Sequence, residues 1–334
     1  MMPIWLIAGV LAGEPSTEPI MEPASSGQVQ GVAEPAAPVD DGVAQVLAMA
    51  EEMRRTGAPK ECVRLLGSVD ARVSEAARSD YLYLRAFCAE LAWDNESAKL
   101  DYLAVIARGG SRVLEARFRL ALVLEDLGDG HGALQQMVIL HRDEGWDLED
   151  SIAVNLERAL AQVAAGKVRK GMKNLEAAML VAKSWDKHSW LRAKAQYVTM
   201  DQALAVAERG VVRGAEKHQG EMVLARVAAL AEAQKGLYKI IELNEPEWIL
   251  RGLHRIGTAY VTFGAELVAA PPPARLAAPQ KALYREQILL KEKELQKKAS
   301  NVFDQGVQMA LRLQFESPWV GRLVSERDRL QAGG

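Results

Sequence analysis

Pairs of small residues recur along the chain with nearly constant spacing, and this repetition limits the fold more than any other feature. Four times between residues 50 and 175, a small residue is followed by another after twelve positions and by a larger residue after four more. The four sets are Ala50, Cys62 and Leu66; Ala86, Ala98 and Tyr102; Ala121, Ala133 and Met137; and Ala159, Gly171 and Leu175. Repetition with a period of roughly 20 to 50 residues is typical of solenoids and related repeat architectures.

The spacing of apolar residues indicates helices throughout. They recur at intervals of three and four, and we find no convincing alternation of period two. An apolar content of 49% is ordinary for a folded protein, so the chain can bury a core. The sequence therefore predicts an all-α fold.

The segment from Leu253 to Tyr260 shows which kind of repeat this is. Leu253, Ile256, Gly257 and Tyr260 share one helix face, because three or four residues make about one turn. Their spacing resembles the first-helix signature W-x2-L-G-x2-Y of the tetratricopeptide (TPR) repeat. The resemblance implies a TPR-like α-solenoid of stacked helical hairpins, in which the two small residues of each set face each other across two helices.

The turns within the hairpins support this interpretation. Gly57, Gly128 and Gly166 each lie seven positions after the first small residue of their set. A glycine in this place is common, because helices often end in a left-handed residue. Only the second set departs, with Trp93-Asp94-Asn95 at the turn.

We expect four segments along the chain. Residues 1–13 form a signal-like segment, 14–41 a disordered, acidic tether rich in proline and alanine, and 42–186 four TPR-like helical hairpins. Residues 187–334 form longer helical pairs and a TPR-like capping unit with a proline-rich insertion. The helices expected in this last segment cover about 189–209, 213–243, 280–314 and 318–331.

The N-terminal run MMPIWLIAGVLAG is apolar and ends in small residues, but contains no Lys or Arg. We favour a cleaved secretory signal; the alternatives are a disordered apolar start and a misassigned start codon. Residues 14–41 hold five prolines, which remove backbone donors, and acids that repel each other, so no core can form there. A partner-binding tail is the alternative to a simple tether.

The last repeat departs from the family pattern. Ala299 and Phe303 supply the second-helix residues opposite Gly257, after an insertion of about thirty residues that contains Pro271-Pro272-Pro273. A helix stripe links the apolar and small residues of this region: Tyr284, Ile288, Leu295, Ala299, Phe303, Gly306 and Ala310. This arrangement resembles that of envelope-associated TPR proteins of gram-negative bacteria.

Candidate groove residues follow from the resemblance, which places positions three before and one after the first small residue on the concave face. These are Tyr83, Phe87, Phe118, Leu122, Leu156 and Leu160. The Lys, Asn and Arg residues of peptide-carboxylate-binding members are absent at these positions. The groove suits an apolar or amphipathic protein segment; the alternative is that the chain's own helices fill it.

No motif indicates catalysis, a cofactor or a metal site. The five histidines show no metal-ligand spacing, and Gly128-x-Gly130-x-Gly132 reads as a turn rather than a phosphate loop. We expect Cys62 and Cys88 to be buried free thiols, with a disulfide as the alternative. The basic face of 280–298 is expected to be solvated, with an anionic-partner patch as the alternative.

Charge and hydropathy exclude further classes. Six of the 44 acidic and none of the 41 basic residues fall in 1–41, so the remainder is nearly balanced, with no general drive toward nucleic acid. No apolar run in 42–334 is long enough to span a membrane. We therefore expect a non-catalytic protein-interaction adaptor without cofactor, metal or small-molecule substrate. It is expected to be exported to the periplasm and to bind protein partners, for which an envelope assembly is one candidate. A cytoplasmic TPR regulator or scaffold is the alternative.

Overall fold

The computed structural model describes residues 41–143, 146–184, 188–209 and 216–332, all of whose regular elements are helices. The signal-like segment and residues 14–40 of the tether lie outside the described residues. The helices are α1 Asp41–Arg55, α2 Pro59–Gly67, α3 Arg78–Leu91, α4 Asn95–Arg108, α5 Val113–Asp126, α6 Gly130–His141, α7 Leu148–Ala164, α8 Val168–Val181, α9 Ser189–Glu208, α10 Glu216–Glu242, α11 Pro246–Ala269, α12 Ala278–Leu313 and α13 Pro318–Ala332, with short 3-10 turns at Asp70–Arg72 and Ala182–Ser184. The all-α prediction is confirmed.

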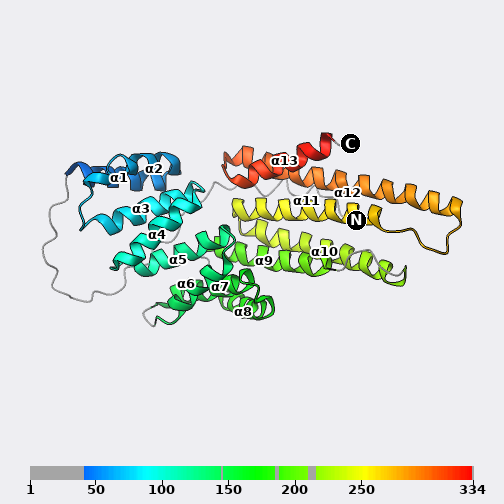
Figure 1. Cartoon of the computed structure of the whole chain (residues 1–334), viewed down its shortest axis with the longest axis horizontal. Helices are drawn as coiled ribbons and strands as arrows, with labels where there is room; N and C mark the ends of the chain where they lie inside the picture. Colours follow the sequence, from blue (N-terminus) through cyan, green and yellow to red (C-terminus); the bar gives the residue numbers. More distant parts are fainter. Residues whose placement is uncertain (1–40, 144–145, 185–187, 210–215, 333–334) are drawn as a thin grey trace.

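Helices α1 to α8 form four antiparallel pairs that stack in chain order (Figure 1). The first helices of successive pairs pack directly on one another, α1 on α3, α3 on α5 and α5 on α7, whereas the second helices approach less closely. The stack therefore curves with the first helices on its inner face. Such an arrangement is a helical solenoid, and it fits a TPR-like fold.

The repeated small residues hold each pair together. All four first-helix residues of the pattern and the second-helix residues Cys62, Ala98 and Ala133 are at most 1% exposed. In the fourth pair, a Cβ on Gly171 would lie 2.8 Å from the backbone nitrogen of Val163 and 3.0 Å from the carbonyl oxygen of Ala159. Any side chain there would push α8 away from α7. The predicted register is confirmed.

The turns of the hairpins also follow the prediction. Gly57, Gly128 and Gly166 have φ angles of 79°, 82° and 77°, which glycine adopts without steric cost. Trp93 takes the same left-handed conformation, with φ 66°. Asp94 and Asp129 then cap α4 and α6 by accepting bonds from the backbone N–H of Ser97 and Gly132.

Four longer helices continue the stack. Helices α9 and α10 pack as one pair and α11 and α12 as the next, with α13 lying on α11 and α12 (Figure 1). The expected helices are found within a few residues of their predicted ends. The predicted stripe on α12 is confirmed, because Ala299, Phe303, Gly306 and Ala310 are buried and its three other members are half-buried.

Buried side chains form two clusters, one running from Val43 to Ala195 and the other from Ala193 to Leu323. They meet at α9, which contributes to both. None of the described helices combines the length and apolar character needed to cross a bilayer.

The expectation of two free thiols is wrong. Cys62 of α2 and Cys88 of α3 form a disulfide, with their Cα atoms 6.0 Å apart, and both residues are fully buried. The stacking of α2 on α3 brings the two side chains together, although 26 residues separate them in sequence. The bond joins the first hairpin covalently to the second.

Candidate functional site

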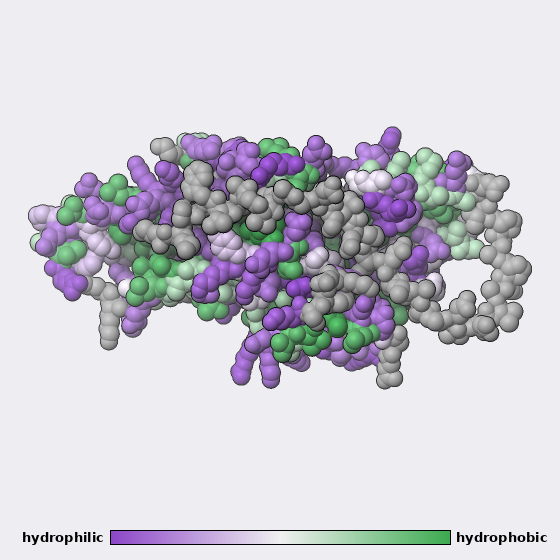
Figure 2. All heavy atoms as spheres, turned by 180° about the vertical axis from the view of Figure 1, so that it is seen from behind, coloured by the Kyte–Doolittle hydropathy of each residue, from purple (hydrophilic) through white to green (hydrophobic). Residues whose placement is uncertain are grey.

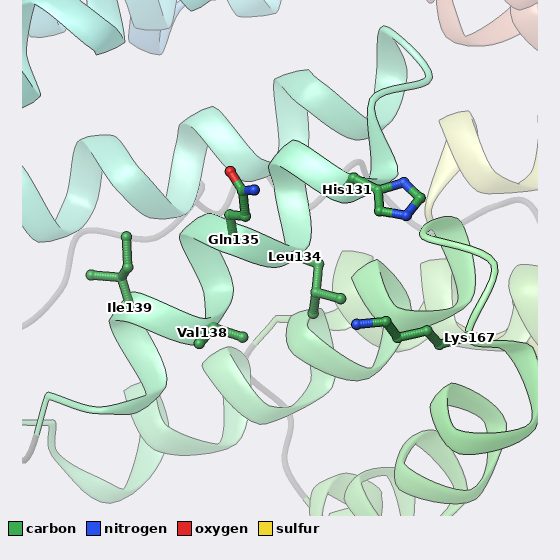
Figure 3. Close-up of a pocket in the computed structure, with 6 residues that line it drawn as sticks. All are labelled: His131, Leu134, Gln135, Val138, Ile139 and Lys167. Carbon is green, nitrogen blue, oxygen red and sulfur yellow. The ribbon is translucent and has the colours of Figure 1, made fainter.

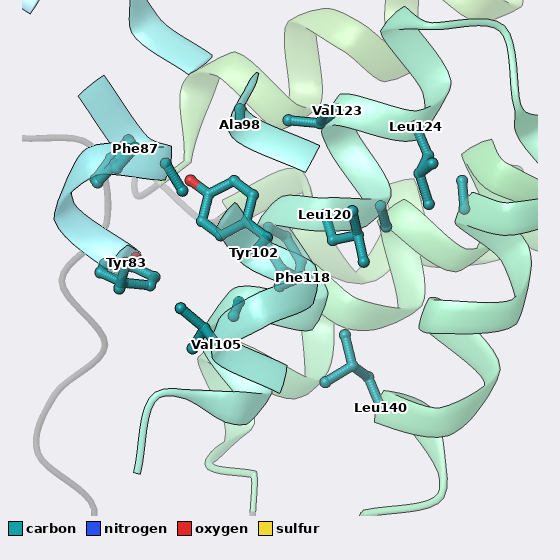
Figure 4. Packing of buried hydrophobic residues seen from close by; sticks show 14 of the residues in the cluster. Tyr83, Phe87, Ala98, Tyr102, Val105, Phe118, Leu120, Val123, Leu124 and Leu140 are labelled. Atoms are coloured by element: carbon teal, nitrogen blue, oxygen red, sulfur yellow. The ribbon is translucent and has the colours of Figure 1, made fainter. Parts of the chain in front are cut away.

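The predicted groove residues lie on the inner helices, and most of their surface is covered. Tyr83, Phe87 and Phe118 are 6%, 4% and 7% exposed, and Leu156 and Leu160 are 0% and 2% exposed. Leu122 is half-buried against the same cluster. Figure 4 shows the rings of Tyr83, Phe87 and Phe118 within the packed layer of helices. The rings of Tyr83 and Phe87 contact each other, with their centres 6.1 Å apart, but the chain itself covers most of the predicted strip.

Arginines cover the aromatic rings. The guanidinium carbon of Arg54 in α1 lies 4.7 Å from the ring centre of Phe87 in α3, and that of Arg119 in α5 lies 4.0 Å from it. Arg112, the residue before α5, lies 5.0 Å from the ring centre of Tyr83. Cations within about 6 Å of an aromatic ring are attracted by its quadrupole. Arg54 and Arg119 are themselves buried, with side chains 8% and 7% exposed, so they are part of the packed layer together with the ring of Phe87.

The carboxylates beside these arginines fix their positions. Arg119 donates to Glu90 over 3.2 Å, and Glu90 accepts a second bond of 2.6 Å from the hydroxyl of Tyr102. Burial raises the pKa of Glu90, and the charge of Arg119 opposes that shift. Arg112 pairs with Asp80 at 3.0 Å and with Glu115 at 2.8 Å, and its side chain is 42% exposed. Arg112 is therefore the ring-covering arginine that a partner can reach most easily.

One hydroxyl in this region has no partner. The Oη atom of Tyr83 is buried and makes no hydrogen bond within the described residues. Burial also raises the pKa of Tyr83, so the hydroxyl stays neutral. An unpaired buried hydroxyl costs stability, so Tyr83 stabilises the core through its aromatic ring and not through its hydroxyl.

A second polar cluster closes the inner face at its C-terminal end. Lys194 of α9 stands where the repeat pattern expects a small residue, and it is 6% exposed. Its Nζ atom lies 2.7 Å from Glu125 of α5 and 2.6 Å from Glu157 of α7. One ammonium thus holds three successive inner helices through two carboxylates. In the sequence, Trp190 and Tyr197 keep the seven-residue spacing of the signature with Lys194 in place of its glycine, but nothing there shows which carboxylates Lys194 meets.

Two carboxylates share this single cation, so the charges do not balance. Burial raises the pKa of Glu157 to about 8, the nearby charge of Glu125 adds to the shift, and Lys194 opposes it. Burial alone would lower the pKa of Lys194, but the two carboxylates raise it overall. Near neutral pH the cluster therefore retains a proton on Glu157, which reduces the buried negative charge.

Helix α11 joins the same end of the inner face. Arg251 donates to Asp126 at the end of α5 over 2.9 Å, and it also pairs with Glu247 on its own helix. The inner surface is thus closed beyond α7 by the chain's own α9 and α11. Leu156 and Leu160 are thus covered by the chain itself, as are Tyr83, Phe87 and Phe118, while Arg112 is the accessible cation beside these rings.

The remaining chemistry is sparse. Among the described residues, no group of three or more histidines, cysteines, aspartates or glutamates could hold a metal ion. His131, His141 and His218 are exposed, and His254 packs edge-on against Trp319 with ring centres 5.3 Å apart. The glycines at 128, 130 and 132 form the turn and the start of α6, as predicted.

Comparisons with known proteins add little to these observations. No protein-family model and no curated protein matches the chain. Among solved structures, "MamA RS-1 ArsTM double mutant" is 15% identical over 62% of this chain and 97% of its own, with a TM-score of 0.40. A second solved structure is titled "Circular tandem repeat protein with novel repeat topology and enhanced subunit contact surfaces". It is 12% identical over 87% of this chain, with a TM-score of 0.27. The match covers 63% of that protein's own length, which is less than two thirds. These scores are too low to carry an argument.

Proposed function

We propose that the chain is a non-catalytic adaptor that binds a protein partner on the inner face of its helical stack and acts in the bacterial envelope. The observation that supports binding is the row of first helices α1, α3 and α5, which pack side by side and carry arginines over buried rings. Extended concave surfaces of this kind are what solenoids use for binding.

The chemistry of the inner face favours an amphipathic segment as the ligand. Acidic groups of such a segment can pair with the accessible Arg112, and its apolar residues can pack on the exposed part of Leu122 and on the small exposed edges of Tyr83 and Phe118. Leu122, which is half-buried, continues the apolar edge from Phe118 along α5. Leu156 and Leu160 support the surface from behind rather than contact the ligand, because α7 is covered by α9.

Export to the envelope is proposed on two observations. The first is the signal-like run of residues 1–13. The second is the buried disulfide between Cys62 and Cys88, because disulfides persist in oxidising compartments and are rare in the cytosol. The alternative is a cytosolic TPR regulator or scaffold, in which these cysteines would be reduced.

The binding proposal is tested by comparing two single variants of the full chain. Arg112→Ala removes the most accessible inner-face guanidinium, and Lys99→Ala removes a half-exposed cation from the outer helix α4. Both proteins are used to capture partners from envelope fractions, with quantification by mass spectrometry and a thermal melt of each variant. We expect Arg112→Ala to lose at least tenfold of the captured partner, while Lys99→Ala behaves as wild type. Equal capture by the two variants would rule out the inner face.

The localisation is tested separately by the intact mass of protein recovered from the periplasm. We expect the mass of a protein that lacks about the first 13 residues and whose two cysteines are joined in a disulfide. Recovery with Met1 in place, or in the cytosol with two free thiols, would favour the alternative.

A further inference from the structure

A pocket lies on the outer side of the stack, away from the inner-face arginines. It has a volume of about 460 Å³ and is lined by His131, Leu134, Gln135, Val138 and Ile139 of α6 and by Lys167, the residue before α8. Figure 3 shows Lys167 with its amino group turned toward Leu134, and Val138 on the same side of α6. The pocket thus combines an apolar wall with a cation at its edge.

The wall is apolar because α6 carries no aspartate, glutamate, lysine or arginine. Leu134 is buried, Val138 is half-buried, and Ile139 keeps 44% of its surface exposed. Along the lower edge of Figure 2, where Figure 1 places α6 to α8, hydrophobic surface lies beside long hydrophilic side chains. An apolar side chain from another molecule can therefore bury surface here.

The cations beside this wall are unlike those of the inner face. Lys167 lines the pocket, and Arg169, Lys170 and Lys173 follow it in sequence on α8. All four are exposed, and none forms an ion pair within the described residues. Arg54, Arg112 and Arg119, by contrast, are each paired with a carboxylate. Because the N-terminal end of a helix is itself electropositive, α8 presents a concentrated positive potential next to the pocket.

We propose that this pocket binds an acidic peptide segment of a partner protein, in which an apolar side chain is flanked by aspartate or glutamate. The apolar side chain packs against Leu134, Val138 and Ile139, and the flanking carboxylates pair with Lys167 and Lys170. Charge complementarity selects an acidic segment, since no carboxylate lines the pocket. The site is separate from the inner face, so the chain offers two binding surfaces.

The test uses a fluorescent synthetic peptide, Glu-Glu-Leu-Leu-Glu-Glu, titrated with the full chain and followed by anisotropy. Two matched peptides replace both leucines with alanine or all glutamates with lysine. We expect binding of the first peptide only, with affinity reduced at least tenfold by Ile139→Ser and by Lys170→Glu. Both positions are exposed, so the variants are expected to fold, which a thermal melt checks.

Matched control variants make the same changes elsewhere. Leu100→Ser alters a leucine of α4 that is 65% exposed, and Lys297→Glu reverses an exposed cation of α12. Both controls, and the inner-face variant Arg112→Ala, should bind the peptide as wild type does. Loss of binding in Arg112→Ala with Ile139→Ser unaffected would place the site on the inner face and overturn the proposal.

Three other results would also overturn it. The first is no binding of the leucine peptide. The second is equal binding of the leucine and alanine peptides, which would reduce the site to a charged surface. The third is a dimer, detected by sedimentation, that Ile139→Ser dissociates while the peptide does not bind, because the occupant would then be a second copy of the chain.

Discussion

Phe303 of α12 lies directly against Gly257 of α11, so closely that a Cβ on the glycine would be 2.2 Å from the Cε1 atom of the phenylalanine ring. Both helices are long, and this contact sets how near they come. Phe303 is fully buried, and Leu253 and Tyr260 on the same face of α11 are 5% and 7% exposed. The signature residues of this helix thus act as one packing surface for α12.

We therefore expect Gly257→Ala to lower the free energy of unfolding by about 1–3 kcal/mol, because the added methyl group displaces the ring or separates the helices. Chemical denaturation of wild type and variant measures the effect. Gly220→Ala in α10 is the matched control: a Cβ there meets nothing within 4 Å, and alanine favours a helix by about 1 kcal/mol. If both variants had the same stability, the close approach at Gly257 would be refuted.

The inner-face rings give a second prediction. Phe87 is 4% exposed and lies beneath Arg54 and Arg119, so Phe87→Ala should cost about 3–5 kcal/mol of stability through the cavity that it leaves. Tyr83→Phe should be neutral or stabilising by up to about 1 kcal/mol, because it removes a buried hydroxyl without a partner. Thermal and denaturant melts check both. A near-native melt of Phe87→Ala would show that the ring is not part of the core.

The Lys194 cluster gives a prediction about pH. The pKa of Glu157 is about 8 in the folded chain, above its ordinary value of 4.5, so the folded state binds the proton more tightly than the unfolded state. Its contribution to stability is complete below pH 4.5 and is lost as the pH rises toward about 8. We expect Glu157→Gln to flatten this decline, since a neutral side chain cannot lose the proton.

Denaturation at several pH values between 5 and 9 measures this effect, with Glu286→Gln on the exposed part of α12 as the control. The wild type and the control should lose stability over the same range, while Glu157→Gln should lose less. A parallel decline in all three proteins would contradict a proton on Glu157.

The disulfide gives the fourth prediction. Closing a loop between residues 26 positions apart restricts the unfolded chain, which corresponds to about 3.5 kcal/mol in the chain-entropy model. Reduction should therefore lower the denaturation midpoint of the wild type. The double variant Cys62→Ala, Cys88→Ala should have the lower denaturation midpoint both with and without reductant. Two reactive thiols in the unfolded, unreduced protein would show that the bond is absent.

Local features explain why much of the fold could be predicted. The helix period follows from the backbone geometry of each residue, so spacing in the sequence identifies the helices and their buried faces. Ala121 and Ala133 reveal their hairpin in the same way, because a twelve-residue separation spans one turn and two short helix segments. The small residues at 50, 86, 121 and 159 were correctly placed for this reason.

The candidate site could be predicted less well, because long side chains reach from one helix to the next. The repeat pattern describes positions within one hairpin and does not show such contacts. The positions of Tyr83, Phe87 and Phe118 on the inner helices follow from the register. Their cover does not, since Arg54 and Arg119 reach Phe87 from the helices on either side. A lysine at a small position was the one visible sign of the cluster at Lys194, but a charge gives no indication of which carboxylates it will meet.

The sequence by itself determined the helices, their hairpin pairing and the residues on each inner face, because these depend on spacings within about forty residues. Only the tertiary structure decided what lies next to those faces. The bond between Cys62 and Cys88, the two carboxylates on Lys194 and the arginines over Phe87 all join different helical pairs. Such contacts depend on the distance and rotation between packed helices, which the packing of side chains sets and which no short-range pattern specifies.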